Sequence, residues 1–325
     1  MATVAQTAAR LATLLTGNGS SLDDPAGGGL VFEDDVVVRP LARTGAPADV
    51  WAIDGGQALV ADARCLQVYV TRAATVRWQG GASTLEDSGE LEAHLLGAGE
   101  GRLATAALVA DGAPVDPGTG VDVNLLRDWG EWRAASEAVA RADDGATILV
   151  DGDLQPDWRI ASAWVSALLD HAGHRHVTLV GVTKHSSLAR GGAPLLGQLE
   201  RQAAADLGPR AMWWAQVAHT RPDVGAGLRV VVARLDPDAR FAFRVDVPWS
   251  VEPAAALGSL SALADDAAFP GYPYPLSVAD RLAACPGWLR EDVFGRLQEG
   301  FDLAGVPDET RERAFADRHR LMERG

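Results

Sequence analysis

Short apolar runs bounded by turn residues recur along the chain, and this pattern predicts buried strands. The clearest run, residues 50–56, reads Val-Trp-Ala-Ile-Asp-Gly-Gly. A second run, residues 148–153, reads Ile-Leu-Val-Asp-Gly-Asp. In each run an aspartate, Asp54 or Asp151, follows the apolar residues, so we expect it at the carboxyl end of a strand. We predict that the fold brings these two aspartates together.

The remaining apolar positions predict a long series of strands and helices. The clearest helix spans 121–141, where Leu125, Trp129 and Trp132 share one apolar face. Further helices are predicted at 2–15, 158–171, 195–207, 253–266, 276–284, 290–304 and 308–324. Further strands are predicted at 30–41, 58–61, 66–75, 177–182, 211–218, 228–235 and 240–247. Residues 79–120, rich in Gly, Ala, Asp and Glu, are expected to form a peripheral insertion with one or two short helices.

This order of elements predicts an α/β fold, a mixed sheet flanked by helices with peripheral helical insertions. Three strands in a meander are followed by alternating helices and strands, which is the order of the ribonuclease H-like architecture. That architecture carries an aspartate on its first strand, a glutamate on its first helix and an aspartate at the end of its fourth strand. Asp54, Glu131 and Asp151 occupy these three positions. A fold analogy of this kind does not by itself establish function.

The composition describes an ordinary globular chain with an acidic balance. It is 47% hydrophobic, with a net charge of −15 and a pI near 4.8. No apolar run reaches the ~18–20 residues of a membrane span, and the N-terminus lacks the basic start of a signal peptide. Two cysteines without metal spacing favour a reducing, cytoplasmic setting. The acidity argues against nucleic-acid binding, although a cluster of metal-binding carboxylates would itself add negative charge.

An aspartate followed by glycine is typical of a hairpin turn, and this interpretation applies to either motif alone. Two such motifs with a suitably placed helical glutamate favour a carboxylate cluster instead. Hard oxygen ligands hold Mg²⁺ or Mn²⁺, and two such ions can promote phosphodiester hydrolysis. Gly55 and Gly56 would then leave clearance for a DNA backbone. Glu131 competes for its role with Glu137, and Arg127, four residues earlier, predicts an ordinary ion pair as the alternative.

Three other features have weaker or divided interpretations. Asp151-Gly-Asp153 resembles the opening motif of haloacid-dehalogenase-type phosphatases, but that motif lies near the start of its domain and here half of the chain precedes it. The histidines at 171, 174 and 176 are interpreted as solvated loop residues. Residues 271–281, with two Tyr-Pro steps, predict either a rigid aromatic packing loop or a tyrosine hydroxyl near phosphate with Asp280 near a metal.

Lysine is almost absent from the chain. Of the 29 basic residues, Lys184 is the single lysine and the others are arginine. A general bias against lysine explains the arginines, and chance retention would explain the exception. The alternative is a site that requires a compact ammonium rather than a planar guanidinium.

Six motifs, in order, resemble those of the NurA nuclease family and cover roughly residues 50–285. They are Ala-Ile-Asp-Gly at 52–55, Leu-Arg-Asp-Trp-Gly-Glu-Trp at 126–132, Ile-Leu-Val-Asp-Gly-Asp-Leu at 148–154, Gly-Val-Thr-Lys-His-Ser at 181–186, Phe-Arg-Val-Asp-Val-Pro at 243–248, and Gly-Tyr-Pro-Tyr-Pro-Leu through Ala279-Asp280. The resemblance implies a manganese-dependent nuclease with 5′–3′ exonuclease and single-strand endonuclease activity, acting in end resection at DNA double-strand breaks. It also implies a ring-like homodimer that works with HerA, a hexameric ATPase.

Carried over by motif, Asp54, Glu131 and Asp151 would be metal ligands for Mn²⁺ or Mg²⁺, with two ions expected. Tyr272 and Asp280 would complete the site, although the family often has histidine at the last position.

Lys184 falls in the family's lysine motif and would contact the scissile phosphate. The nuclease domain would span 50–285, with an N-terminal helix and strand extension over 1–49 and C-terminal helices over 286–325 packing on the same domain. The alternative function is a non-catalytic DNA-binding or ATPase-docking subunit on the same fold.

Overall fold

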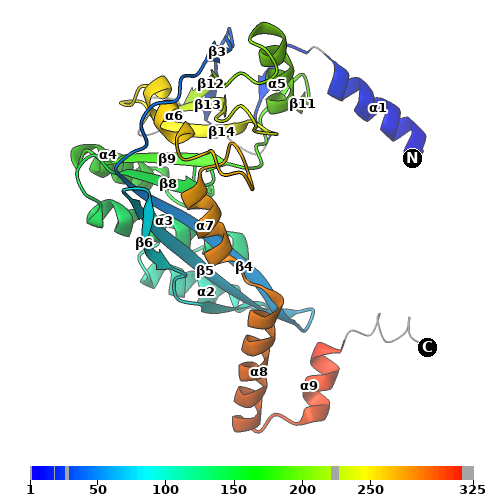
Figure 1. The fold of residues 1–325 in the computed structure, drawn as a ribbon. Coiled ribbons are helices and arrows are strands. Elements are labelled where there is room, and N and C mark those ends of the chain that lie inside the picture. Colours follow the sequence, from blue (N-terminus) through cyan, green and yellow to red (C-terminus); the bar gives the residue numbers. More distant parts are fainter. Residues whose placement is uncertain (1, 18, 26–28, 221–226, 317–325) are drawn as a thin grey trace.

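The computed structural model describes residues 2–17, 19–25, 29–220 and 227–316 (Figure 1). The end of the last predicted helix, residues 317–324, lies outside this part of the chain. The helices are α1 Val4–Thr16, α2 Gly101–Ala110, α3 Val123–Arg141, α4 Ser162–His174, α5 Leu195–Asp206, α6 Pro253–Ser261, α7 Tyr274–Ala283, α8 Gly287–Leu303 and α9 Asp308–Phe315. Among the described helices, none combines the length and apolar character needed to cross a membrane.

The strands form one large mixed sheet and a small separate one. In chain order they are β1 Leu22–Asp23, β2 Leu30–Phe32, β3 Arg39–Pro40, β4 Asp49–Asp62, β5 Leu66–Gln79, β6 Ala82–Asp87, β7 Glu92–Gly97, β8 Thr147–Asp151, β9 Thr178–Thr183, β10 Ala189–Arg190, β11 Ala193–Pro194, β12 Trp213–Thr220, β13 Leu228–Arg234 and β14 Phe243–Pro248. The large sheet runs in the order β2-β12-β13-β14-β9-β8-β4-β5-β6. β3 pairs with β12 and β7 pairs with β5 at its margins.

The centre of the large sheet has the predicted ribonuclease H-like arrangement. β4 and β5 are antiparallel, and β6 and β7 continue this meander on β5. On its other side β4 pairs in parallel with β8, and β8 pairs in parallel with β9. The antiparallel strands β14, β13 and β12 extend the sheet beyond β9. The predicted mixed sheet flanked by helices is therefore confirmed.

Two predictions for the margins of the sheet differ from the structure. Residues 79–120 contribute β6 and β7 to the sheet in addition to the helix α2, so the segment is only partly helical. The single strand predicted over 30–41 is divided into β2 and β3, which both pair with β12. β2 ends at Phe32, but Glu33 stays beside β12: its backbone N–H donates to the carbonyl oxygen of Val217 and its side chain accepts a hydrogen bond from Gln216.

Strand β4 differs most from its prediction. The separate strand predicted at 58–61 is wrong, because these residues belong to β4, and β6 supplies the third strand of the meander. Asp54 lies in the middle of β4 rather than at its end, because Gly55 and Gly56 continue to pair with Ala73 and Arg72 on β5. The hairpin-turn interpretation of this motif is therefore wrong. Asp151, by contrast, is the last residue of β8, as predicted.

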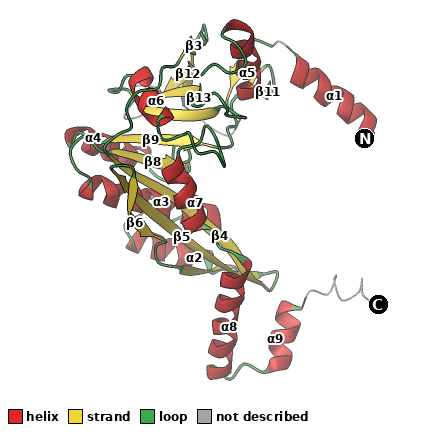
Figure 2. Ribbon diagram, in the orientation of Figure 1, coloured by secondary structure: helices red, strands yellow, loops and turns green. Residues whose placement is uncertain are grey.

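Helices cover the two faces of the central strands (Figure 2). Trp51 and Ile53 of β4 pack in one buried cluster with α3 and α4, whereas Val50 and Ala52 pack in another with α6 and α7. This alternation follows from the two-residue period of a strand. It places the even-numbered Asp54 on the face that α7 covers.

Three helices extend away from the sheet (Figure 1). Helix α1 has no buried residue, and α8 buries only Leu289 and Val293. Helix α9 likewise has no buried residue. These helices therefore contribute little to the core that positions the central strands.

Candidate metal centre

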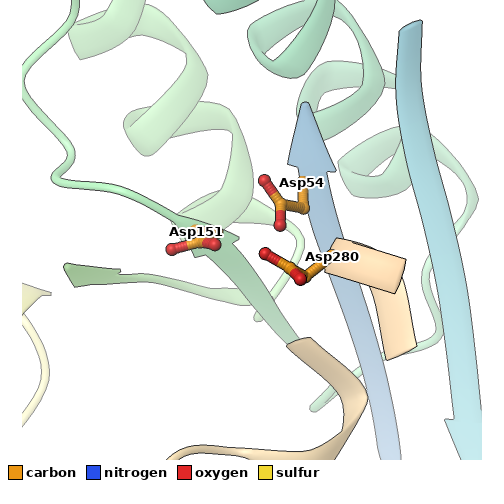
Figure 3. A group of neighbouring side chains, drawn as sticks. All are labelled: Asp54, Asp151 and Asp280. Atoms are coloured by element: carbon orange, nitrogen blue, oxygen red, sulfur yellow. The ribbon is translucent and has the colours of Figure 1, made fainter. Parts of the chain in front are cut away.

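Three carboxylates from distant parts of the chain converge on the face of the sheet that α7 covers (Figure 3). Asp54 comes from the middle of β4, Asp151 from the end of β8, and Asp280 from α7. One oxygen of each lies within 4.8 Å of the others. The side chains of Asp54 and Asp151 are about one-tenth exposed, whereas that of Asp280 is 58% exposed, so the group opens toward solvent at Asp280.

The sheet register explains why two of these residues meet. Ile53 pairs with Val150 in the parallel β4–β8 ladder, so Asp54 and Asp151 follow at the same level. Asp54 is two residues after Ala52 and Asp151 two residues after Leu149, and Ala52 and Leu149 both pack in the cluster that includes α7. Both aspartates therefore point to the face that α7 covers. Helix α7 comes close to β4 because Gly56 has no side chain; a Cβ there would lie 1.8 Å from the carbonyl oxygen of Ala283.

The ammonium of Lys184 lies among the three carboxylates. Its Nζ is 2.5 Å from Asp151 Oδ2, 2.6 Å from Asp280 Oδ1 and 3.9 Å from Asp54 Oδ2. Lys184 follows β9 directly, with the same parity as Val180 and Val182, which pack toward α6 and α7. The group thus holds one cation in this structure, supplied by the chain itself.

Glu131 reaches the site from the opposite face. Its carboxylate lies where the side chain of Gly55 would be, since a Cβ there would be 2.1 Å from Glu131 Oε1. Gly55 therefore makes room for Glu131 and Gly56 makes room for α7. The prediction that these glycines leave clearance for a DNA backbone is wrong. Because β8 ends at Asp151, the side of β4 that faces β8 has no paired strand beyond that point, and Glu131 can approach the carboxylates past this end.

Glu131 also forms the ion pair expected within its own helix. Arg127 Nε lies 3.2 Å from Glu131 Oε1. Glu131 is buried, at 6% exposure, whereas its competitor Glu137 is exposed. The structure thus brings Asp54, Asp151, Asp280 and Lys184 into direct proximity and places Glu131 beside them, outside the group of three.

Burial makes the carboxylates costly to ionise. It raises the pKa of Asp54 to about 9, with further contributions from Asp151 and Glu131. Burial is also the main cause that raises the pKa of Glu131 to about 8. Burial lowers the pKa of Lys184, but the neighbouring Asp151 and Asp280 outweigh it and the net shift is upward. A divalent cation would favour the ionised carboxylates, which is the usual linkage between metal and ligand protonation.

Tyr272 combines a packing role with an unsatisfied polar atom. Its ring is 1% exposed and contacts Phe243 and Phe269, as the packing interpretation predicts. Its hydroxyl has no hydrogen-bond partner among the described residues, and Lys184 Nζ lies 5.1 Å from the ring centroid. Burial, with Asp151 and Asp54 nearby, raises the pKa of this hydroxyl further above its ordinary value. A buried hydroxyl without a partner is costly and fits a ligand-binding role.

A pocket of about 200 Å³ lies between α3 and the end of β8. Its lining includes Asp128, Glu131, Asp151, Asp153 and Thr183. The Thr183 hydroxyl has no hydrogen-bond partner in the described part of the chain. Of the acidic residues of the site, the pocket reaches Asp151 and Glu131.

A buried ion network supports the loop that follows Asp151. Arg244, 1% exposed, donates two hydrogen bonds of 2.9 Å to Asp246, and its Nη1 lies 3.2 Å from Asp153. Asp246 in turn accepts a hydrogen bond from the backbone N–H of Leu154. The sequence alone predicts no separate role for Arg244 and Asp246. The available signal was the alternation of charged and apolar residues in a central strand, Phe-Arg-Val-Asp-Val.

No protein-family profile and no curated protein sequence matches the chain. Solved structures do resemble it. The NurA nuclease from Sulfolobus solfataricus is similar with a TM-score of 0.58 and 16% identity, over 83% of this chain and 88% of that one. A second NurA structure has a TM-score of 0.46 and 10% identity, over 74% of this chain and 85% of that one. The catalytic domain of human Endonuclease V has a TM-score of 0.40 and 15% identity, over 82% and 92%.

The first of these similarities establishes the fold. Its TM-score and coverage show that the chain shares the NurA-like arrangement over most of its length, which confirms the fold that the motif resemblance implies. Identity at this level does not carry over activity, so function has to be argued from the site itself.

Proposed function

We propose that the protein is a divalent-metal-dependent nuclease that hydrolyses phosphodiester bonds in DNA. One observation carries the proposal: Asp54, Asp151 and Asp280 gather around a single cation position on a nuclease-type sheet. Carboxylates in such proximity repel one another unless a cation lies between them. The Lys184 ammonium takes that position in this structure, which supports the view that the group is built to hold positive charge.

The donor set fits Mn²⁺ or Mg²⁺. Asp54, Asp151 and Asp280 would hold the ion, with Glu131 beside them as a ligand for a second one. Such ions take oxygen ligands, and when bound they activate water and stabilise the leaving oxygen of a phosphodiester. Asp280, where related proteins often have histidine, supplies the same kind of hard oxygen donor as the other two.

The remaining residues of the site would bind and orient the substrate. Lys184 carries a positive charge close to where a phosphate would approach, and we assign it contact with the scissile phosphate. The unpaired Tyr272 hydroxyl would donate a hydrogen bond to a phosphate oxygen. Arg127 holds the Glu131 side chain at the edge of the site through their ion pair.

The motif resemblance supports a more specific version of this proposal. We propose 5′–3′ exonuclease and single-strand endonuclease activity in double-strand break resection, with a homodimer that works with a HerA-type ATPase. The exposed helices α1 and α8 are consistent with such partners, because they present apolar side chains to solvent. Val4, Trp288 and Leu303 are 88%, 67% and 92% exposed.

Nuclease assays with linear DNA test the proposal. Purified protein with Mn²⁺ should degrade linear DNA, and Asp54→Asn and Asp151→Asn should abolish this activity while leaving the fold intact. Asp238→Asn, an exposed aspartate paired with Arg210, is the matched control and should keep full activity. A wild-type protein inert with Mn²⁺ and Mg²⁺, both alone and with a HerA-type partner, would rule out the enzyme.

The second candidate is a non-catalytic DNA-binding or ATPase-docking subunit. The Lys184 ion pairs favour it, because they partly neutralise the carboxylates without any metal. Thermal stabilisation separates the two. A nuclease site should gain on the order of 1 kcal/mol or more from saturating Mn²⁺, and the Asp54→Asn/Asp151→Asn/Asp280→Asn protein should not.

A further inference from the structure

We propose that Lys184 is a built-in counter-ion: its ammonium occupies the cation position of the metal-free site and must move out when a divalent metal binds. The inference rests on the metal site of the proposed function and adds a competition to it. It makes metal loading an exchange of one cation for another.

The geometry carries this proposal. The Lys184 ammonium is in contact with Asp151 at 2.5 Å and Asp280 at 2.6 Å, and Asp54 lies at 3.9 Å. The oxygens of these same carboxylates lie within 4.8 Å of one another, so one small cation fills the space between them. An ammonium and a metal ion cannot both lie there.

Charge explains why the ammonium is held there and why it can be displaced. When all three carboxylates are ionised, as a bound divalent ion favours, one ammonium leaves a formal charge of −2 (three negative, one positive), which a divalent ion compensates better. The side chain of Lys184 is 29% exposed and that of Asp280 is 58% exposed, so the ammonium has a route to solvent on that side.

The choice of residue fits a point charge. Lys184 is the single lysine of a chain whose other basic residues are arginine. An ammonium is compact and resembles a small cation, whereas a guanidinium is planar and directs its donors in a fixed fork. The four-carbon stem also lets the ammonium withdraw without disturbing β9. After withdrawal it would be free to contact a substrate phosphate, which links metal loading to substrate binding.

The exchange has a measurable cost in metal affinity. When the ammonium fills the site in most molecules, the apparent dissociation constant rises by the inverse of the vacant fraction. Removing the ammonium should therefore tighten Mn²⁺ binding. It should also destabilise the metal-free protein, because the carboxylates lose their counter-charge.

The experiment is a Mn²⁺ titration of chelator-stripped protein by calorimetry, with thermal unfolding measured in parallel. Lys184→Met, with Lys184→Gln as a second variant, should bind Mn²⁺ at least about ten-fold more tightly than wild type and melt lower without metal. Arg77→Met is the matched control, because Arg77 also lies between two carboxylates, Asp49 at 2.9 Å and Asp143 at 2.5 Å, with similar exposure. It should melt lower but leave Mn²⁺ affinity unchanged.

If both Lys184 variants bound Mn²⁺ with the same affinity as wild type or more weakly, the proposed exchange of cations would be overturned, while the proposed metal site would still hold. If neither wild type nor the Lys184 variants bound Mn²⁺, both the cation exchange and the proposed nuclease function would be overturned. If Arg77→Met tightened binding as much as Lys184→Met, the gain would reflect general loss of positive charge and the proposal would be rejected. The results therefore separate failure of this inference from failure of the nuclease proposal.

Discussion

Gly55 gives the sharpest test of how the site is assembled. A Cβ at this position would lie 2.1 Å from Glu131 Oε1 and 2.7 Å from its Cδ. Ordinary contact begins at 3.4 Å, so Gly55→Ala requires the carboxylate to move by roughly 1.3 Å. The backbone of Gly55 does not have a positive φ, so alanine meets no conformational barrier there.

The expected magnitude follows from two opposing effects. Overpacking against a buried group costs about 1–3 kcal/mol. Replacing glycine by alanine in a compatible conformation returns about 0.4–1 kcal/mol through the unfolded state. We therefore expect a net loss of about 1–2 kcal/mol. The displaced Glu131 should lower DNA cleavage by about 100-fold, the size of effect that a misplacement near 1 Å can produce.

A double-mutant cycle isolates the contact. Urea unfolding is measured for wild type, Gly55→Ala, Glu131→Ala and the double variant. Once Glu131 is truncated, Gly55→Ala should become neutral or stabilising, with a coupling energy of about 1–3 kcal/mol. If Gly55→Ala costs the same in both backgrounds, or leaves cleavage unchanged, the account of Glu131 is refuted.

The other predictions concern the surroundings of the site. Gly56→Ala should cost more stability than Gly55→Ala in urea unfolding, because its Cβ would meet the backbone of Ala283 at 1.8 Å, whereas Gly130→Ala, with its nearest atom at 3.7 Å, should be harmless. Without metal, the folded protein holds a proton on Asp54 that the unfolded chain loses above its ordinary pKa. Stability in chelator should therefore fall as pH rises from about 4 to 9, by up to about 1.4 kcal/mol per pH unit for Asp54, and Asp54→Asn should reduce this slope to the part that Glu131 contributes. Arg244→Met should cost about 3–5 kcal/mol in chemical unfolding by leaving buried Asp246 unpaired, with part recovered in Arg244→Met/Asp246→Leu. If Arg244→Met were as stable as wild type, the stabilising role assigned to the Arg244–Asp246 network would be wrong.

Much of the fold could be predicted because its signals are local. The apolar runs around Asp54 and Asp151 are short and bounded by turn residues, and the α3 pattern is long and periodic. A meander followed by helix–strand units then leaves few arrangements for the sheet. Parallel pairing of β4 with β8 aligns the two aspartates without further information.

The remaining features depend on contacts between distant segments. Two glycines after an apolar run normally indicate that a strand ends, yet β4 continues through them. Glycine is needed at these two positions because Glu131 and α7 occupy the space where side chains would lie. The contact between Lys184 and Asp280 joins residues 96 positions apart, and no local pattern encodes it. The approach of Glu131 from the other face depends on where β8 ends. These features could be established only from the folded chain.

The central claim is that the carboxylates of Asp54, Asp151 and Asp280 hold a divalent metal. Anomalous diffraction from crystals soaked in Mn²⁺ tests it directly. The account predicts an anomalous peak in contact with all three carboxylates, at the position that the Lys184 ammonium takes here, with the lysine side chain moved away. A protein that cleaves DNA with Mn²⁺ but shows no peak at these residues, or shows its peak elsewhere, would contradict it.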